Sequence, residues 1–138
     1  MTHLGDAMNN KIALINGWSR GLWKSTAINL AGKGVNCIIN YLSKRAEAER
    51  VIAEIQQTGQ AGVALQLDTG DTKSYKDFSK RVKNELEQHW QCDCFDFLVN
   101  NAGIGVNALF AETTEELFDQ LMNIHFKGVF FWLKHFYR

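Results

Sequence analysis

Several features are scarce in this sequence, and their scarcity excludes whole classes of protein. The longest uninterrupted apolar run, Val129–Leu133, is far shorter than the ~20 residues that a membrane-spanning helix needs. The first residues have neither the basic region nor the apolar region of a secretory signal. Only three cysteines are present, an odd number that does not suggest a disulfide framework. We therefore expect a cytoplasmic protein with reduced thiols and no membrane partner.

An excess of charge is also missing, because fifteen basic and fifteen acidic residues cancel. A chain without such an excess is not expected to bind nucleic acid. A metal site is not expected either, because His89, Cys92 and Cys94 have no fourth ligand nearby. Proline is absent altogether, from which no functional inference follows. The remaining composition, 46% hydrophobic and 22% charged over 138 residues, is that of one globular domain with a real core.

The chain alternates between short apolar runs and segments with helical periodicity. After a disordered leader over residues 1–10, we expect strands at 11–16, 35–41, 63–67 and 95–99. Helices are expected at 20–33, after Ser43 as N-cap, after Asp71 or Thr72, and after Thr113 in a capping box with Glu116. This alternation predicts one α/β domain over 11–138, with a parallel sheet, right-handed crossovers and helices on both faces.

The expected helices carry apolar faces of two kinds. Two of them show a single stripe, made of Ala48, Val51, Ile52 and Ile55 in one and of Tyr75, Phe78, Val82 and Leu86 in the other. The last helix, from Leu117 to Phe136, is apolar around nearly its whole circumference. A helix with one solvated side would show a stripe instead. We therefore expect this helix to take part in a homo-oligomer.

A glycine turn follows the first expected strand. The apolar run 12–15 leads into Gly17 and Gly21, and a helical pattern begins directly afterwards. A strand, a glycine turn and a helix open a dinucleotide-binding βαβ unit, in which backbone N–H groups and a helix N-terminus receive a pyrophosphate. Glycine suits this turn because the backbone needs positive φ and the phosphate must approach it closely. The place of the third glycine of this pattern is taken by Trp23.

Two further segments lie in the register of the same unit. Asp68 follows the third expected strand, and the tetrapeptide Asn100-Asn101-Ala102-Gly103 follows the fourth. With the glycine turn, these segments make residues 11–136 resemble the first half of a short-chain dehydrogenase/reductase. The resemblance implies a Rossmann-like, doubly wound parallel sheet with strand order 3-2-1-4, truncated here after about four strands. It also implies hydride transfer between a nicotinamide cofactor and a small alcohol or carbonyl substrate.

The resemblance assigns roles to individual residues. Those that would bind the cofactor are Gly17, Ser19, Arg20 and Gly21 around the pyrophosphate, Asp68 near the adenine, and Asn100, Ala102 and Gly103 beside the adenine ribose. His125 occupies the place of the family's helical asparagine, counted back from Gly128. It would hold a water in a proton relay, or else it is a packed core residue.

The choice of cofactor follows from charge. Dinucleotide sites that take NAD usually place an acid about 20 residues past the glycines, on the ribose 2′-hydroxyl. No Asp or Glu occurs over residues 35–46, whereas Lys44 and Arg45 follow the second strand and Arg20 lies in the turn. These cations favour NADP over NAD. The alternative for Lys44 and Arg45 is a solvated first turn of a helix.

The sequence departs from the family pattern in two respects. In the glycine turn, Asn16 replaces the usual threonine and Trp18 replaces a small residue. The indole of Trp23, in the place of the third glycine, would overpack the helix or fill the pyrophosphate site. The family's catalytic serine and Tyr-x-x-x-Lys belong to the half that is not matched. No Tyr-x-x-x-Lys occurs in the 138 residues, because Arg45 and Ser79 stand four residues after Tyr41 and Tyr75.

Three functions are therefore open. The chain is the cofactor-binding half of an NADPH-favouring oxidoreductase, or a non-catalytic remnant that binds protein through its last helix. The third is a module that binds NADPH without turning it over. In each case we expect the 138-residue chain to have no reductase activity of its own.

Overall fold

The computed structural model describes residues 8–17, 21–101 and 108–136, and the elements within them alternate between strand and helix. The strands are β1 (Ile12–Gly17), β2 (Asn36–Tyr41), β3 (Gly62–Gln66) and β4 (Phe97–Asn101). The helices are α2 (Leu22–Gly32), α3 (Arg45–Gln57), α4 (Tyr75–Trp90), α5 (Glu115–Met122) and α6 (Val129–Phe136). Short 3₁₀ turns span Thr72–Ser74 and Phe110–Glu112, and a π-helical turn over Asn123–Gly128 joins α5 to α6.

The four strands form one parallel sheet in the order β3-β2-β1-β4, which confirms the predicted fold class and strand order. In this order the chain fills the β2 and β3 side of β1 first and then crosses to the other side for β4. The topological switch point therefore lies between β1 and β4. Leu14, in the middle of β1, is in register with Ile38 on β2 and Leu98 on β4.

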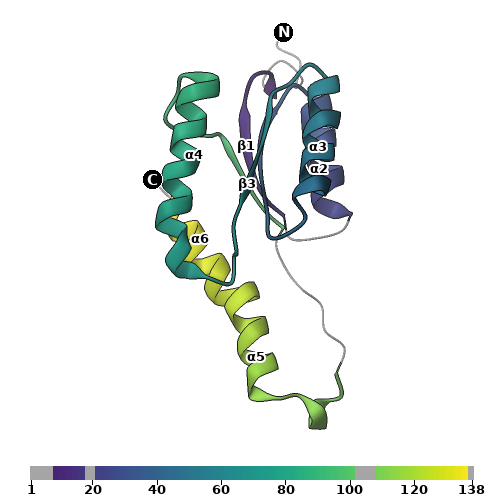
Figure 1. Ribbon diagram of the computed structural model, residues 1–138, viewed down its shortest axis with the longest axis vertical. Coiled ribbons are helices and arrows are strands. Elements are labelled where there is room, and N and C mark those ends of the chain that lie inside the picture. The colour runs from purple at the N-terminus through teal and green to yellow at the C-terminus, as the bar shows by residue number, and fades with distance from the viewer. Residues whose placement is uncertain (1–7, 18–20, 102–107, 137–138) are drawn as a thin grey trace.

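Helices cover both faces of the sheet, as the alternating pattern predicts. Figure 1 shows α2 and α3 on one side of the strands and α4 and α6 on the other. The first face buries Ile15 and Ile39 against Ala27 and Val51. The second face buries one apolar cluster, which comprises Ile12, Leu14, Ile38, Leu67, Tyr75, Phe78, Val82, Leu86 and Trp132. All four residues of the predicted α4 stripe are in this cluster.

Two predicted helix starts are wrong, and local hydrogen bonds explain one of them. The Thr113 hydroxyl donates to the Leu109 carbonyl (3.1 Å) and so closes the preceding 3₁₀ turn. Thr114 caps α5 in its place and accepts a hydrogen bond from the Leu117 amide at 3.2 Å. Helix α3 has Lys44 as its N-cap, without a side-chain hydrogen bond, in place of the expected Ser43. Of the expected caps Asp71 and Thr72, Asp71 caps the 3₁₀ turn that leads into α4, whereas the N-cap of α4 itself is Ser74.

The fourth strand begins two residues later than predicted because Asp96 occupies the start of the ladder. Its carboxylate accepts a hydrogen bond from the Ile12 amide (2.9 Å), and its own amide donates to the Ile12 carbonyl at 2.8 Å. The side chain thereby takes a position that a backbone carbonyl would hold. Regular pairing with β1 starts at Phe97.

Part of the expected leader is among the described residues. Asn10 donates its amide to the Gly34 carbonyl at 2.8 Å, and Met8 packs against the first core cluster. Gly34 has φ +89°, and a side chain there would meet Asn9 at 2.8 Å. Residues 1–7 lie outside the described part of the chain.

The C-terminal helices are only partly covered. Helix α5 extends away from the sheet and continues directly into the π-helical turn that follows it (Figure 1). Trp132 of α6 is fully buried and lies 5.6 Å from Tyr75 and 5.4 Å from Phe78, between ring centroids. The exposed apolar side chains of this region are Phe118, Met122, Phe126, Phe130 and Leu133. No described helix is long and apolar enough to cross a membrane.

The exposed apolar side chains predict self-association. Burying five or six such side chains stabilises a complex by about 1.5–3 kcal/mol each, and β4 is an edge strand whose Phe97 is 37% exposed. We expect light scattering at micromolar concentration to show a dimer or larger species, and Phe126→Glu with Phe130→Glu to shift it towards monomer. Phe110→Glu, outside α5 and α6, is the control. A clean 15.7 kDa monomer with cooperative unfolding would contradict this expectation.

Candidate functional site

The candidate site is the edge of the sheet where the carboxyl ends of the strands meet. Gly17 ends β1, Asn100 is the penultimate residue of β4, and Asp68 follows β3. In open α/β sheets, ligands bind outside these carboxyl ends at the topological switch point. Here the switch point lies between Gly17 and its register partner Asn101. The sequence-predicted residues Gly17, Asp68 and Asn100 therefore lie on the expected edge.

The N-terminus of α2 opens towards this edge. Gly21 is its N-cap with φ +79°, a backbone conformation that strongly favours glycine. Among the described residues no side chain caps the helix, and its first turn contains no acidic residue. A Cβ at Gly21 would meet no described atom within 4 Å. The free N–H groups and the positive end of the helix dipole therefore suit an anion such as a phosphate.

Gly17 and Trp23 fit against each other at the end of β1. A Cβ built on Gly17 would lie 2.8 Å from Trp23 Cγ, which is closer than real side chains approach. The indole is only 5% exposed and belongs to the core between α2 and the sheet, with Ala27 and Ala31. Gly17 thus makes room for the residue that replaces the third glycine. The expectation that Trp23 would fill the pyrophosphate site is not met, because its ring packs into the core.

Burial of this indole has an energetic cost as well as a benefit. Trp23 Nε1 is buried and has no hydrogen-bond partner among the described residues. An unsatisfied buried donor costs about 1–3 kcal/mol, whereas burial of a large aromatic side chain is strongly stabilising. Trp23 therefore stabilises this part of the core through burial of its ring against Gly17, and its N–H group adds no hydrogen bond among the described residues.

Three asparagines from neighbouring strands form a hydrogen-bonded row beneath the glycine turn. Asn40 Nδ2 donates to Asn16 Oδ1 at 2.8 Å, and Asn16 Nδ2 donates to Asn100 Oδ1 at 3.3 Å. The Gly17 amide donates to Asn40 Oδ1 at 2.8 Å. Asn16 and Asn40 are 2% and 1% exposed. Sequence analysis missed this row; its only sign there is an asparagine two positions after an apolar strand residue in three strands.

The loop after β3 is held to the C-terminal helices. Asp68 is exposed, and its Oδ1 accepts a hydrogen bond from the Gly70 amide at 2.8 Å. The buried Tyr75 hydroxyl donates to the Thr69 carbonyl (2.6 Å) and also lies 3.2 Å from the Gly128 carbonyl. A Cβ at Gly128 would lie 2.8 Å from the Thr69 carbonyl oxygen, so only glycine allows this close approach. The loop after β3 and the π-helical turn are therefore joined by the Tyr75 hydroxyl and by close backbone contact.

Tyr75 is the tyrosine at this junction, but it is not suited to acid–base chemistry. Burial raises the pKa of Tyr75 to about 12, and the nearby Asp68 and Asp71 add to the shift. A general acid or base works best with a pKa close to the working pH. Tyr75 is a structural residue whose hydroxyl joins two backbone carbonyls.

The comparisons with known proteins decide the family. The family model for short chain dehydrogenases matches residues 11–138, which is nearly the whole chain. The chain belongs to the short chain dehydrogenase family. This confirms the resemblance on which the site residues were chosen. The short chain dehydrogenase fold is also found in the promiscuous reductase LugOII, which superimposes with a TM-score of 0.85 at 26% identity.

The similarity to individual short chain dehydrogenases covers only part of each relative. The chain is 35% identical over 121 residues to a tetrahydroxynaphthalene reductase of Pestalotiopsis fici. It is 36% identical over 121 residues to a 3-oxoacyl-[acyl-carrier-protein] reductase of Staphylococcus epidermidis. These matches cover 88% of this chain but 42% and 47% of the two relatives. The LugOII match covers 92% of this chain and 53% of LugOII. The chain thus spans about half the length of its relatives.

Several predicted site residues of this short chain dehydrogenase domain fall outside the described part of the chain. They are Ser19, Arg20, Ala102 and Gly103, together with the side chain of His125. The backbone of His125 lies in the π-helical turn Asn123–Gly128. Their roles remain predictions.

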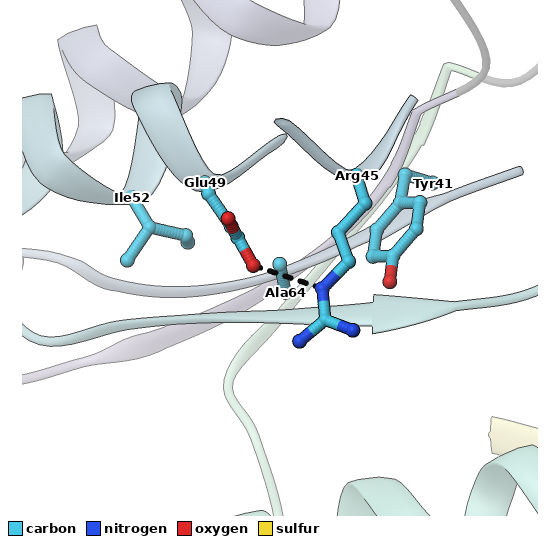
Figure 2. Close-up of a pocket in the computed structure, with 5 residues that line it drawn as sticks. All are labelled: Tyr41, Arg45, Glu49, Ile52 and Ala64. Atoms are coloured by element: carbon cyan, nitrogen blue, oxygen red, sulfur yellow. Dashed lines mark hydrogen bonds and ion pairs between the residues drawn. The ribbon is translucent and has the colours of Figure 1, made fainter. Parts of the chain in front are cut away.

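The two cations after β2 are each paired on their own helix. Arg45 Nε lies 2.9 Å from Glu49 Oε1, and Lys44 Nζ lies 3.9 Å from Glu47 Oε2. The hydrogen bond and charge of Glu49 raise the pKa of Arg45. Figure 2 shows Arg45 between Glu49 and Tyr41. These three residues line a pocket of about 220 Å³ together with Ile52 and Ala64. Both cations are exposed, so these pairs are weak and leave the cations available to an anion.

The contact between Gly17 and Trp23 predicts a coupling that a double-mutant cycle measures. Gly17→Ala should lower the free energy of unfolding by about 1–3 kcal/mol, because the new methyl group overlaps the indole. In a Trp23→Ala background, which itself costs about 3–5 kcal/mol, the same change should cost much less. Urea unfolding gives all four values. Gly32→Ala in α2, where a Cβ meets nothing within 4 Å of the described residues, is the control. Equal costs in both backgrounds would refute the contact.

Proposed function

We propose that this chain binds NADP(H) at the carboxyl edge of its sheet, as the cofactor-binding half of a short-chain oxidoreductase. The observation that carries the proposal is the uncapped N-terminus of α2, which follows Gly17 and Gly21 at the topological switch point. The backbone N–H groups there would hold the pyrophosphate, with Ser19 and Arg20 in the turn. A bound nicotinamide would supply the hydride chemistry of the family.

The remaining cofactor contacts are distributed along the same edge. Asp68 would lie beside the adenine, and Asn100, Ala102 and Gly103 beside the adenine ribose. The exposure of Asp68 and the hydrogen bonds of Asn100 support these roles. Room for a phosphate at this place is supported by Gly21, where a Cβ would meet no atom of the described residues within 4 Å.

NADP is the preferred cofactor in this proposal, and NAD is the alternative. Support comes from Arg20, Lys44 and Arg45 and from the absence of an acid over residues 35–46. An arginine contact to a 2′-phosphate is charge-assisted and strong. The fold alone does not decide the cofactor, since an NADH-dependent reductase in complex with NAD has a TM-score of 0.82 to this chain at 22% identity.

The substrate class is a small carbonyl or alcohol compound. Two relatives are named as reductases of tetrahydroxynaphthalene and of 3-oxoacyl-[acyl-carrier-protein], which supports a carbonyl substrate. The 138 residues nevertheless contain no Tyr-x-x-x-Lys, and His125 alone would supply at most a water-mediated proton relay. We therefore propose that this chain binds the cofactor without transferring hydride by itself.

A protein-interaction module is the second candidate function. It is favoured by the exposed apolar side chains of α5 and α6, which include Phe118, Phe126 and Phe130. Monomeric proteins rarely expose contiguous apolar patches of this kind. A second copy of the chain, in a homo-oligomer, is the proposed partner.

Cofactor titration tests the main proposal. Purified protein should bind NADPH more tightly than NADH, and Arg20→Ala should remove the preference, because one charge-assisted contact contributes about 1.5–3 kcal/mol. That range corresponds to roughly a 10- to 150-fold difference in Kd. Lys33→Ala, which removes a cation at the opposite end of α2, should leave both affinities unchanged. Equal binding of NADPH and NADH by the parent would refute the NADP assignment. If the parent bound neither cofactor, the main proposal would be refuted and the protein-interaction module would be the remaining candidate function.

Turnover is tested separately. NADPH mixed with the chain and a panel of small ketones should not be consumed above the background rate, because no Tyr-x-x-x-Lys is present to protonate the carbonyl oxygen. The Staphylococcus epidermidis reductase is the positive control. Saturable consumption of NADPH by the purified chain, lost together with cofactor binding in a Gly21 variant, would show that another residue supplies the proton.

A further inference from the structure

We propose that Asn16 and Asn40 are positioning residues that set the orientation of the Asn100 side-chain amide. They turn its NH₂ group towards the edge where the cofactor binds, so that Asn100 serves as a hydrogen-bond donor there. This inference rests on the proposed binding of a dinucleotide. It assigns a role to two buried side chains, of which Asn16 replaces the usual threonine of the family pattern and Asn40 lies outside that pattern.

The three asparagines occupy one row across the sheet. Asn16 is in register with Asn40 on β2 and with Asn100 on β4. One row below, on the same face, lie Leu14 and its partners, which belong to the second core cluster. On this face of the sheet the side chains in the row of Leu14 are apolar, whereas those in the row of Asn16, the last before the carboxyl edge, are amides. Asparagine is depleted in strands, so three in one row call for a reason other than strand stability.

The hydrogen bonds fix the orientation of each amide in turn. A backbone N–H can only donate, so Asn40 must present Oδ1 to Gly17. Its Nδ2 then faces Asn16, which must present Oδ1 in reply. Asn16 Nδ2 therefore points towards β4, where it donates a hydrogen bond to Asn100 Oδ1. The direction of donation runs from β2 through β1 to β4.

Reversal of a single amide is costly. If Asn16 were flipped, its NH₂ would face the NH₂ of Asn40, and its carbonyl would face the carbonyl of Asn100. Since Asn16 and Asn40 are at least 98% buried, water does not compensate the unpaired groups. An unsatisfied buried donor or acceptor costs about 1–3 kcal/mol. The backbone amide of Gly17 on β1 therefore determines, through Asn40 and Asn16, the orientation of the Asn100 side chain on the adjacent strand β4.

Asn100 ends this row at the switch point. Its Oδ1 is engaged by Asn16, and the side chain is exposed, so Nδ2 is the group that remains for a ligand. Ribose hydroxyl and phosphate oxygens accept such a hydrogen bond. A row of opposite direction would present Oδ1 instead, which accepts from a ribose hydroxyl but repels a phosphate oxygen. The structure thus assigns Asn100 to an acceptor-rich ligand, which a dinucleotide is.

Three variants at Asn16 distinguish the effect of the hydrogen-bond direction of the row from the effect of side-chain shape at this position. Asn16→Thr supplies a hydroxyl that both accepts from Asn40 and donates to Asn100, so the direction is kept. Asn16→Val has the same shape without the hydroxyl, so the row is interrupted. Asn16→Asp accepts on both sides, so Asn100 must turn its NH₂ inwards. Thr and Val both suit a buried strand position, which keeps the test valid if the Asp variant does not fold.

The first measurement needs no cofactor. Hydrogen exchange of the Asn100 side-chain NH₂, followed by NMR, should be fast in the parent and in Asn16→Thr. It should slow down in Asn16→Asp, where that group becomes bonded within the row. Unchanged exchange in a folded Asp variant would overturn the proposal, whether or not the parent binds NADPH.

The second measurement is NADPH affinity. Asn16→Val should bind NADPH about fivefold more weakly than Asn16→Thr, and Asn16→Asp more weakly still. Asn36→Asp is the control: Asn36 is also a buried strand asparagine, but it lies at the opposite end of β2 and accepts from the Ala61 amide. Equal affinities of the Thr and Val variants would overturn the proposal. Absence of NADPH binding by the parent would instead refute the proposed function. In that case the exchange measurement alone would test the donor-to-acceptor direction of the asparagine row.

Discussion

The hydrogen bond from the Gly17 amide to Asn40 Oδ1 is the contact on which the rest of this structure depends. Gly17 is the last residue of the central strand β1, and three constraints meet there. Its amide determines the direction of the asparagine row, its missing side chain admits the Trp23 indole, and its position starts the glycine turn. A methyl group at this one residue would disturb both the core above it and the edge beside it.

The same edge is supported from the far side by the loop after β3. Tyr75 donates to the Thr69 carbonyl and lies within hydrogen-bond distance of the Gly128 carbonyl, so its hydroxyl connects the loop with Asp68 to the π-helical turn. The loop with Asp68 is therefore joined to the segment that carries His125. Beyond this joint, α5 and the exposed face of α6 have little support from the described part of the domain. The described part of the chain thus combines a hydrogen-bonded carboxyl edge of the sheet with an exposed apolar surface on α5 and α6.

Much of the fold could be predicted from the sequence, because parallel α/β units leave a strong pattern. The stripe of α4 and the Asp71 cap are where periodicity and capping rules place them. The predicted helix caps Ser43 and Thr113 are wrong, because the residue that caps a helix depends on backbone geometry that the neighbouring turns determine. The asparagine row could not be predicted, since it exists only once the register of three strands is known. The position of the Trp23 indole likewise depends on packing against Gly17.

Mapping the cofactor by NMR tests the central claim most directly. Titration of ¹⁵N-labelled protein with NADPH should shift the backbone amides of Gly17, Gly21, Asp68 and Asn100, which surround the carboxyl edge. Amides at the opposite end of the sheet, such as those of Asn36 and Asp96, should not move. Shifts confined to that opposite end, or saturation of the protein with NADPH without any change at Gly17 and Gly21, would contradict the account.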